Sequence, residues 1–256
     1  MGWLGMTRIV HASDLHFGPQ FQRDVFDLAV EEINSLDPDL MVITGDLSED
    51  GLISQLREAR DGIKRFRAGD MVVLSGNHDY RSTGYLPFKR FFGFKRVFEG
   101  DGFVLISLST ARPDRDEGEV GYRQGLWLER ELSKLSKRDG LTKIVAMHHH
   151  LLPIPDTGPD RLTIIDAGDV LQTLIEGGVD LLLCGHRHRP WKWSVEGMEI
   201  AHAGSLSSAR LRGFFANSYN VIDLKGGEAR IRLKVVGGEE LDFKELKRAR
   251  VDYLGI

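Results

Sequence analysis

A chain of 256 residues suits one large domain or two small ones, and its 41% hydrophobic and 28% charged residues are ordinary for a protein with a sizeable core. The formal net charge of −4 disfavours long nucleic acid as a partner, because a duplex-binding protein more often has a net basic face. No apolar run approaches the roughly 18–20 residues of a membrane span, and no secretory signal is recognisable. The single cysteine, Cys184, excludes an internal disulfide, which points to a reducing compartment. We therefore expect a cytoplasmic protein.

The first half of the chain alternates short apolar runs with stretches in which apolar residues recur at helical spacing. Buried strands are predicted at 8–12, 40–44, 71–75, 104–109, 143–147 and 181–184. Helices are predicted between them, at 22–36, 53–67, 125–137 and 167–176. This alternation predicts an α/β fold in which at least part of the sheet is parallel.

After Cys184 the pattern changes to successive strands, which are predicted at 199–203, 218–224 and 228–236. Turn signals at Gly197, at Gly204 and at 225–227 indicate that these strands form antiparallel hairpins. The tail from Gly237 onward is rich in charge and is expected to form a short surface helix.

Two segments have no clear periodicity, 80–102 and 110–123. Long loops in a compact domain often form the rim of a functional site, so both segments are candidates for that role. The phenylalanines of 88–98 could form a lid that stacks on a base, but we expect them to pack over the sheet.

Polar side chains that can bind metal follow five of the predicted strands. They are Asp14 and His16, Asp46, Asn77 with His78 and Asp79, the run His148, His149 and His150, and His186 with His188. In α/β sheets, ligands bind in the crevice beyond the carboxyl ends of the strands. Five strand ends would therefore direct these side chains toward one crevice.

The chemistry of these side chains predicts a metal site. Carboxylate, imidazole and amide oxygen suit divalent Mn, Fe, Zn, Co or Ni, with Mn the preferred assignment, whereas Ca and Mg favour all-oxygen shells. The glycines before Asp46, Asn77 and His186 would let the backbone turn sharply beside an ion. Each motif alone is weak, since an Asp-X-His is more often a solvated turn and an Asn-His-Asp could cap a helix. Their joint occurrence offers more ligands than one ion can use, which favours two metals bridged by a carboxylate.

The order Asp-X-His, Gly-Asp, Gly-Asn-His-Asp, His-His and Gly-His-X-His resembles that of the calcineurin-like metallophosphoesterase superfamily over about residues 8–205. The resemblance implies a four-layer α-β-β-α sandwich of two mixed sheets flanked by helices. It also implies a single domain over 1–256, in which 206–256 supply C-terminal hairpins and a tail.

By this resemblance, seven residues would bind two metal ions roughly 3.5 Å apart. One ion would be held by Asp14, His16, Asp46 and His188, and the other by Asp46, Asn77, His148 and His186. His148 is chosen within the triple because the superfamily's ligand lies directly after the strand, and His149 is the alternative. His150 is expected to face the rim of the site. His202 is expected either at this rim or in the core, and the sequence favours neither position. Both histidines are candidates for substrate binding together with Asn77 and His78.

A metal-bridging hydroxide would attack phosphorus, because metal coordination lowers the pKa of water by many units. His78 is expected to act without binding metal, by donating to a phosphoryl oxygen or protonating the leaving group. Asp79 is the second expected catalytic residue, holding the His78 ring in the right tautomer.

Four further residues have simpler expected roles. His11 lies inside the first predicted strand and is expected in the core, and Cys184 is expected to be a small buried apolar residue. Arg210 and Arg212 could reach a second phosphate of a substrate, but they are expected to be solvated loop residues.

The block at 121–128, followed by Glu131 and Leu132, resembles one found in small phosphodiesterases of the cyclic-nucleotide type. It favours a phosphodiesterase that acts on a small phosphoester such as a nucleotide, although Leu151 stands where those enzymes often carry a proline soon after the histidines. A phosphomonoesterase, a protein phosphatase or a nuclease of the same fold are the alternatives. A non-catalytic scaffold is a further alternative. It is disfavoured because every expected ligand position has a residue that can bind metal. The oligomeric state is left open.

Overall fold

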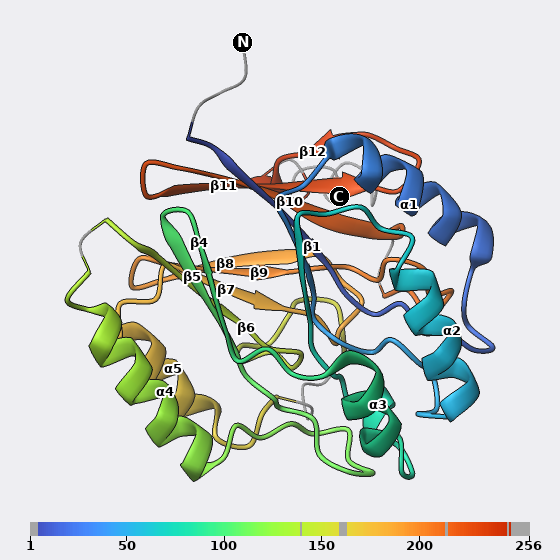
Figure 1. Cartoon of the computed structure of the whole chain (residues 1–256), viewed down its shortest axis with the longest axis horizontal. Helices are drawn as coiled ribbons and strands as arrows, with labels where there is room; N and C mark the ends of the chain where they lie inside the picture. Colours follow the sequence, from blue (N-terminus) through green and yellow to red (C-terminus); the bar gives the residue numbers. More distant parts are fainter. Residues whose placement is uncertain (1–4, 139, 159–162, 213–214, 245, 247–256) are drawn as a thin grey trace.

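Two mixed β-sheets of six strands each form the centre of the molecule (Figure 1). The computed structural model describes residues 5–138, 140–158, 163–212, 215–244 and 246. The strand order is β12-β11-β10-β1-β2-β3 in the first sheet and β4-β5-β6-β7-β9-β8 in the second. β1, β2 and β3 are parallel to one another, as are β5, β6, β7 and β9, whereas β10, β11, β12, β4 and β8 pair antiparallel with their neighbours.

The elements of the described chain have the following bounds. The first sheet consists of β1 (Thr7–Ala12), β2 (Leu40–Ile43), β3 (Asp70–Val73), β10 (Ser218–Lys225), β11 (Glu228–Val235) and β12 (Glu240–Leu241). The second consists of β4 (Val97–Gly100), β5 (Phe103–Ser107), β6 (Thr142–Ala146), β7 (Leu181–Cys184), β8 (Trp191–Val195) and β9 (Met198–His202). The helices are α1 (Arg23–Leu36), α2 (Ile53–Ile63), α3 (Tyr85–Phe92), α4 (Tyr122–Leu135) and α5 (Ala167–Glu176), with a 3₁₀ turn η1 (His78–Tyr80).

Alternating side chains of the strands divide the apolar core into three layers. In β1, Ile9 belongs to the cluster between the two sheets, whereas its neighbour Val10 packs with α1 and α2. In β5, Leu105 likewise faces the other sheet, and Ile106 packs against α4 and α5. Helices therefore cover the outer face of each sheet, as Figure 1 shows for α4 and α5 on one side and α1 and α2 on the other. The expected four-layer sandwich is confirmed.

Most predicted elements are present with ends shifted by a few residues. Helix α2 ends at Ile63 rather than at the predicted Arg67. Beyond Ile63 the chain forms single turns, in which the Arg65 N–H donates to Gly62 O and the Phe66 N–H donates to Ile63 O. Helix α4 begins three residues early, at Tyr122, where the carboxylate of Asp166 accepts the N–H groups of the two residues before the helix.

Five elements have no counterpart in the sequence prediction: η1, α3, β4, β8 and β12. Helix α3 lies in the phenylalanine-rich segment, where Phe88 is buried against the α1 and α2 layer, so the expected packing role of these rings is confirmed. The tail from Gly237 first forms the two-residue strand β12, helical backbone follows at 243–244 and 246, and 245 and 247–256 lie outside the described residues, so only the start of the expected helix is described. Among the described helices, none combines the length and apolar character that a membrane span needs.

His11 lies in the core, as expected, and is fully buried in β1. Its Nε2 lies 3.0 Å from the hydroxyl of Thr44, and its Nδ1 accepts from the Nδ2 of Asn220 at 3.2 Å. Burial, only partly offset by the charge of Asp14, lowers the pKa of His11 to about 3. The ring is therefore neutral in the folded state at every pH near neutrality.

We expect His11 to make the fold sensitive to mild acid. Its pKa is lower in the folded than in the unfolded chain, so its contribution to stability is present above the unfolded pKa of about 6.5 and is lost progressively as pH falls from that value to the folded pKa of about 3. Urea unfolding of the metal-free protein should show a free-energy loss from pH 7.5 to 5.5 that is smaller in His11→Gln. The slope that His11 adds is at most about 1.4 kcal/mol per pH unit. Equal losses in both proteins would contradict this expectation.

Candidate metal centre

The loops that follow β1 and β2 continue the pairing of those strands and so fix the first three candidate ligands. The N–H of Asp14 donates to Gly45 O at 3.0 Å, and the N–H of His16 donates to Asp46 O at 2.9 Å. From the second sheet, the N–H of His186 donates to the carboxylate of Asp14 at 3.0 Å. Hydrogen bonds donated by backbone N–H groups, to carbonyl oxygens within the first sheet and to the Asp14 carboxylate from the second, thus join loops of both sheets at the carboxyl ends of their strands.

Five of the seven candidate ligands have a left-handed backbone, which is uncommon for residues other than glycine. Their φ angles are 56° for Asp14, 54° for His16, 51° for Asp46, 75° for His186 and 51° for His188. Such residues cost on the order of 1–3 kcal/mol each and collect at functional sites, where the surrounding structure holds them in place. The chain therefore bends at each strand end in a way that points these side chains inward.

The glycines before three of these ligands act mainly by leaving space. A Cβ at Gly76 would lie 2.1 Å from Asp46 Oδ1, and one at Gly185 would lie 1.9 Å from Ser13 Oγ and 2.8 Å from Asp14 Oδ2. Gly45 combines a positive φ of 102° with a similar close approach, since a Cβ there would lie 2.7 Å from His148 Nδ1. The expected sharp turn therefore applies to Gly45, and close approach applies to all three.

Four side chains direct their ligand atoms at one point: Asp14, His16, Asp46 and His188. The Nε2 atoms of His16 and His188 are 2.9 Å apart, and His188 Nε2 is 3.2 Å from Asp14 Oδ1. His16 Nε2 is 3.8 Å from both Asp14 Oδ1 and Asp46 Oδ2. Ligands about 2.1 Å from a common metal lie about 3 Å apart, so this group could hold a divalent ion.

A second group meets the first at Asp46. Asn77 Oδ1 is 3.1 Å from His148 Nε2 and 3.0 Å from His186 Nδ1, and these two ring nitrogens are 3.3 Å apart. His148 Nε2 is also 3.3 Å from Asp46 Oδ2, the same oxygen that faces His16. The other oxygen of Asp46 accepts the His78 N–H at 2.9 Å, so Oδ2 is the one directed at both groups.

Neighbouring atoms fix which nitrogen each ring presents. His148 Nδ1 donates to Thr44 O at 2.7 Å, His188 Nδ1 donates to Arg210 O, and His16 Nδ1 lies 2.9 Å from a carboxylate oxygen of Glu49. Each of these rings therefore keeps Nε2 as a lone-pair donor for a metal. The buried Oδ1 of Asp14 has no hydrogen-bond partner among the described residues, as expected for an oxygen that faces a cation.

The electrostatics of the side chains in this centre indicate an environment that attracts positive charge. Burial alone would lower the pKa values of His16 and His148, but the carboxylates around them raise these values to about 10 and about 9. Burial would raise the pKa of Asp14, but His188 and His16 hold it well below its usual range. The carboxylates that draw protons to these rings would equally draw divalent cations, which would displace those protons.

Glu49 contacts the candidate metal centre and was not predicted from the sequence. Its Oε2 faces His16 Nδ1 at 2.9 Å, and its Oε1 accepts from the Arg210 guanidinium at 2.8 Å. Carboxylates that orient a ligand histidine typically affect metal affinity by 10–100-fold when they are changed. Its position three residues after Asp46 was the only signal for it in the sequence.

We expect Glu49→Gln to weaken Mn affinity by about 10–100-fold, because the amide cannot supply the charge that supports His16 as a ligand. Competition for Mn against a chelating dye would measure the change. Glu119→Gln is a matched control, since Glu119 pairs with Arg112 in an exposed loop. Unchanged affinity in Glu49→Gln would mean that the His16 ring is oriented without this carboxylate.

His78 lies beside both groups, but its neighbour Asp79 does not hold its ring. His78 Nδ1 is 2.6 Å from the main-chain oxygen of Glu49, and its ring packs edge-on against His16 with centroids 4.7 Å apart. The expectation that the Asp79 carboxylate holds the His78 ring is therefore wrong, because Glu49 O is the atom that contacts Nδ1 of this ring. The Asp79 carboxylate accepts instead from the N–H groups of Leu47, Ser48 and Gly76 at 2.8–3.1 Å, which ties together the loops after β2 and β3.

The three consecutive histidines have separate surroundings. Both ring nitrogens of His149 have partners away from the two groups, Thr110 Oγ1 at 2.8 Å and Asp116 O at 3.1 Å, so the geometry favours His148 as the ligand. His150 was expected at the rim but is fully buried, with its ring stacked on His186 at 5.4 Å between centroids.

His202, which was expected at the rim or in the core, is fully buried in the core at the end of β9. Cys184, on the neighbouring strand, is also fully buried, as expected, and burial raises the pKa of its thiol. A role for His150 or His202 in substrate binding stays a prediction, which would require a substrate to reach completely buried rings.

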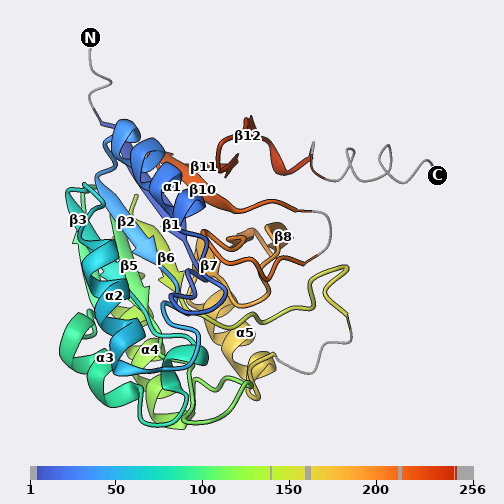
Figure 2. The same ribbon diagram turned by 90° about the vertical axis from the view of Figure 1, so that its right-hand side faces the viewer.

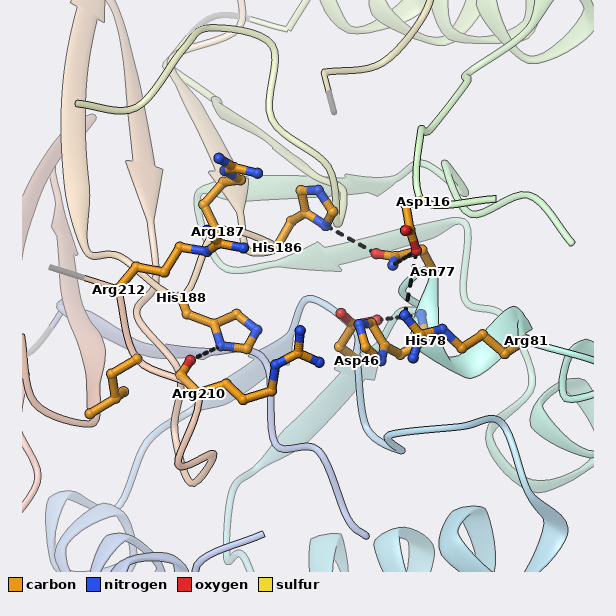
Figure 3. A pocket seen from close by; sticks show the side chains of 11 residues that line it. Asp46, Asn77, His78, Arg81, Asp116, His186, Arg187, His188, Arg210 and Arg212 are labelled. Atoms are coloured by element: carbon orange, nitrogen blue, oxygen red, sulfur yellow. Dashed lines mark hydrogen bonds and ion pairs between the residues drawn. The ribbon is translucent and has the colours of Figure 1, made fainter. Parts of the chain in front are cut away.

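The candidate metal centre opens into a cleft of about 390 Å³ (Figure 3). Asp46, Asn77, His78, His186 and His188 line it together with residues not predicted from the sequence. Those residues are Arg81, Asp116, Arg187 and Leu211, joined by Arg210 and Arg212, which were expected to be solvated. Asp116 accepts from the amide of Asn77 at 3.2 Å, which leaves the Asn77 oxygen facing the two histidines.

Comparison with known proteins agrees with this geometry. The family model of the calcineurin-like phosphoesterases matches residues 7–190, a range that includes all seven candidate ligands. The chain belongs to this family. Its similarity to solved structures includes a purple acid phosphatase of yellow lupin, with a TM-score of 0.71 and 16% identity over 92% of this chain and 53% of that one. At this identity the likeness shows the fold alone.

Two curated relatives of the family are named as cyclic nucleotide phosphodiesterases. The 3′,5′-cyclic adenosine monophosphate phosphodiesterase of Escherichia coli is 34% identical over 59% of this chain and 54% of its own length. The cAMP/cGMP dual specificity phosphodiesterase of Mycobacterium tuberculosis is 28% identical over 77% of this chain and 66% of its own length. The chain thus spans between about half and two thirds of these relatives.

The block at 121–128 lies on and just before α4, away from the cleft. Its Gln124 donates to the oxygens of Ser109 and Val120 and accepts the Ser109 N–H, so it holds the start of the helix to the loop after β5. None of the described residues that line the cleft comes from this block. Its resemblance to small phosphodiesterases therefore has a structural explanation that involves no substrate contact.

Proposed function

We propose that this chain is a metal-dependent phosphodiesterase that hydrolyses a small phosphodiester. One divalent ion would be held by Asp14, His16, Asp46 and His188, and the other by Asp46, Asn77, His148 and His186. The observation that carries this proposal is the convergence of both groups of ligand atoms on Asp46 Oδ2, in a cleft lined by arginines. When bound, the two ions would activate water for attack and neutralise charge on the phosphoryl oxygens.

The protein's own residues would supply binding and orientation. The arginines of the cleft would hold an anionic ester, because guanidinium groups match the geometry of phosphate oxygens. His78, with its Nδ1 engaged by Glu49 O, would present Nε2 to the reacting group. Manganese is our first choice of metal because each group mixes nitrogen and oxygen ligands, and Fe, Zn, Co or Ni satisfy the same mixture.

Hydrolysis of a diester is favoured over that of a monoester by the names of the curated relatives, which are cyclic nucleotide phosphodiesterases. A nucleotide is therefore the first class of substrate to test. We place the reaction in a reducing compartment, the cytoplasm, because the one cysteine of the chain is buried and unpaired.

Activity profiling after metal removal and reloading with Mn tests the proposal. The substrates would be bis-(p-nitrophenyl) phosphate, p-nitrophenyl phosphate, 3′,5′-cyclic AMP and single-stranded DNA. We expect chelation to abolish hydrolysis, Mn to restore it, and the diester to react faster than the monoester. Faster hydrolysis of the monoester would make the chain a phosphomonoesterase, and preference for DNA would make it a nuclease. Two bound ions without hydrolysis of any substrate would indicate a scaffold.

A further inference from the structure

Exposed apolar side chains gather where two helices begin, beside the cleft of the candidate metal centre. Among the described residues, seven large apolar side chains are exposed, and four of them lie at the starts of α2 and α3. The exposed fractions are 50% for Leu52 and 54% for Ile53 at α2, and 36% for Tyr85 and 61% for Leu86 at α3. Single exposed apolar residues are ordinary, whereas a group of them indicates a surface for a partner or a membrane.

The two helix starts lie against each other and next to the cleft. A Cβ placed at Gly84 would lie 2.7 Å from Gly51 O, so the residues directly before Tyr85 and Leu52 are in contact. Gly51 also packs on Arg81, since a Cβ at Gly51 would lie 2.5 Å from Arg81 O, and Arg81 lines the cleft. Figure 1 and Figure 2 both show α2 and α3 side by side. The exposed apolar side chains therefore adjoin the side of the cleft that Arg81 forms.

The exposed face of α3 also has positive charge. Leu86, Lys89 and Arg90 are three and four residues apart, a spacing that places them on one face of a helix. All three are exposed, whereas Phe88 is buried. In the part of the chain that the structure describes, the side chains of Lys89 and Arg90 form no ion pair or hydrogen bond. This face of α3 therefore combines apolar surface with two uncompensated cations, in a chain whose net charge is −4.

Such a combination matches a surface that is anionic outside and apolar beneath. Leu52, Ile53 and Leu86 have no aromatic ring to stack on a base, so a nucleic acid would leave their apolar surface without a partner. A second copy of the chain, docked symmetrically through this face, would place these cations against the same cations of that copy. An anionic bilayer instead takes apolar side chains into its acyl boundary and cations among its headgroups.

The α2–α3 face consists of the exposed side chains at the two helix starts and on α3: Leu52, Ile53, Tyr85, Leu86, Lys89 and Arg90. We propose that the α2–α3 face binds reversibly to membranes that contain anionic lipid. The contact is peripheral and requires no membrane-spanning helix. Because Arg81 connects this face to the cleft, bound protein holds the candidate metal centre close to the membrane surface. Membrane binding goes beyond the proposed function and does not depend on it.

Co-sedimentation of the full chain with lipid vesicles tests the proposal. Vesicles of phosphatidylcholine alone are compared with vesicles that contain about 30% phosphatidylglycerol, which supplies the negative charge. Each cation near an anionic surface strengthens binding by about fivefold, so binding to the anionic vesicles should be about 10–30-fold tighter. Raising the salt concentration to about 0.5 M should weaken this binding by screening. No binding to either kind of vesicle, or equal binding to both, would overturn the proposal.

A charge variant assigns the binding to the α2–α3 face. The double variant Lys89→Gln/Arg90→Gln should weaken binding to the anionic vesicles by about 10–30-fold, because it removes both cations. The double variant Arg123→Gln/Arg130→Gln is the matched control. It removes two exposed cations of α4 and should bind like the wild type. Equal losses in the two double variants would mean that total charge, and no particular face, determines the binding.

An apolar variant tests insertion into the bilayer. Leu86→Ser should weaken binding to the anionic vesicles by about 10-fold or more, the range for burial of a leucine side chain. Ile165→Ser is the matched control, because Ile165 is 63% exposed just before α5. Neither side chain lines the cleft, so thermal melts and hydrolysis of bis-(p-nitrophenyl) phosphate should be unchanged in both variants. Wild-type binding by Leu86→Ser would contradict insertion of this face.

Sedimentation velocity without vesicles tests the other occupant of the face. A monomer in the wild type supports the proposal, and a dimer that Leu86→Ser dissociates would assign the face to a second copy and overturn it. Vesicle binding is measured without turnover, so it also separates the two proposals. A chain that binds anionic vesicles but hydrolyses no substrate would contradict the proposed function alone, and an active chain that binds no vesicles would contradict membrane binding alone.

Discussion

Asp46→Asn is expected to release both metal ions and to lower the rate of hydrolysis by about 10³-fold or more. A single oxygen of this side chain faces both groups of ligand atoms, at 3.8 Å from His16 Nε2 and 3.3 Å from His148 Nε2. An amide keeps the size of the carboxylate but removes the negative charge that two cations would share. The metal ions supply several kcal/mol of transition-state stabilisation, and each 1.4 kcal/mol corresponds to about a tenfold rate change.

Elemental analysis after dialysis against Mn would give the number of ions bound, and a thermal melt would report whether the variant folds. Asparagine can still accept the His78 N–H that Asp46 Oδ1 accepts at 2.9 Å, so the loop should remain in place. Asp70→Asn is a matched control, because Asp70 lies at the exposed start of β3 and pairs with Lys95. A variant that binds two ions with wild-type affinity would disprove the bridging role.

The fold was predictable wherever burial leaves a local periodicity in the sequence. β1, β2, β5, β6 and β7 are completely or largely buried, and their apolar runs were found within two residues of their ends. β8 was not predicted because it has no continuous apolar run: at the edge of the second sheet, Lys192 and Ser194 alternate with the apolar residues of WKWSV. That alternation is itself the period-2 signal of a half-buried strand, so this element was within reach of the sequence.

The candidate ligands were predictable because each follows a strand, and the ends of parallel strands meet at one edge of a sheet. The distances from His188 to Asp14 and from His148 to Asp46 agree with the two predicted groups, although occupancy by metal stays a prediction. The residues that orient these ligands could not be found in this way. Glu49 and Thr44 contribute through contacts with His16 and His148 that depend on the three-dimensional path of two loops.

Consecutive histidines illustrate the same limit. Successive side chains leaving a strand point in different directions, so sequence alone could not choose between His148 and His149. It also could not show that His150 is fully buried, with its ring stacked on that of His186, which lies far from it in the sequence. Arg81 and Arg187 were missed for a related reason, and Arg210 and Arg212 were expected to be solvated, because the residues that these side chains contact, such as Thr157 for Arg212, lie far from them in the sequence.

His78→Ala is expected to keep both metal ions and to lower the rate by about 10²–10⁴-fold, the range for a positioned acid or base. His78 lies in the cleft, and its Nδ1 is 2.6 Å from the main-chain oxygen of Glu49, an acceptor that requires the proton on this nitrogen. The Nε2 is then the atom available to a substrate. Because both groups of ligand atoms form without His78, metal content should not follow the loss of rate.

The dependence on the leaving group distinguishes two roles for this ring. If His78 protonates the leaving oxygen, the loss should be larger for an alkyl ester than for a p-nitrophenyl ester, whose leaving group scarcely needs a proton. Burial lowers the pKa of His78 despite the opposing charge of Asp46, so proton donation would require the minor, protonated form of the ring and should weaken as pH rises. An equal loss for both esters would instead favour a contact with a phosphoryl oxygen. Loss of metal in proportion to rate would make His78 a ligand and contradict both roles.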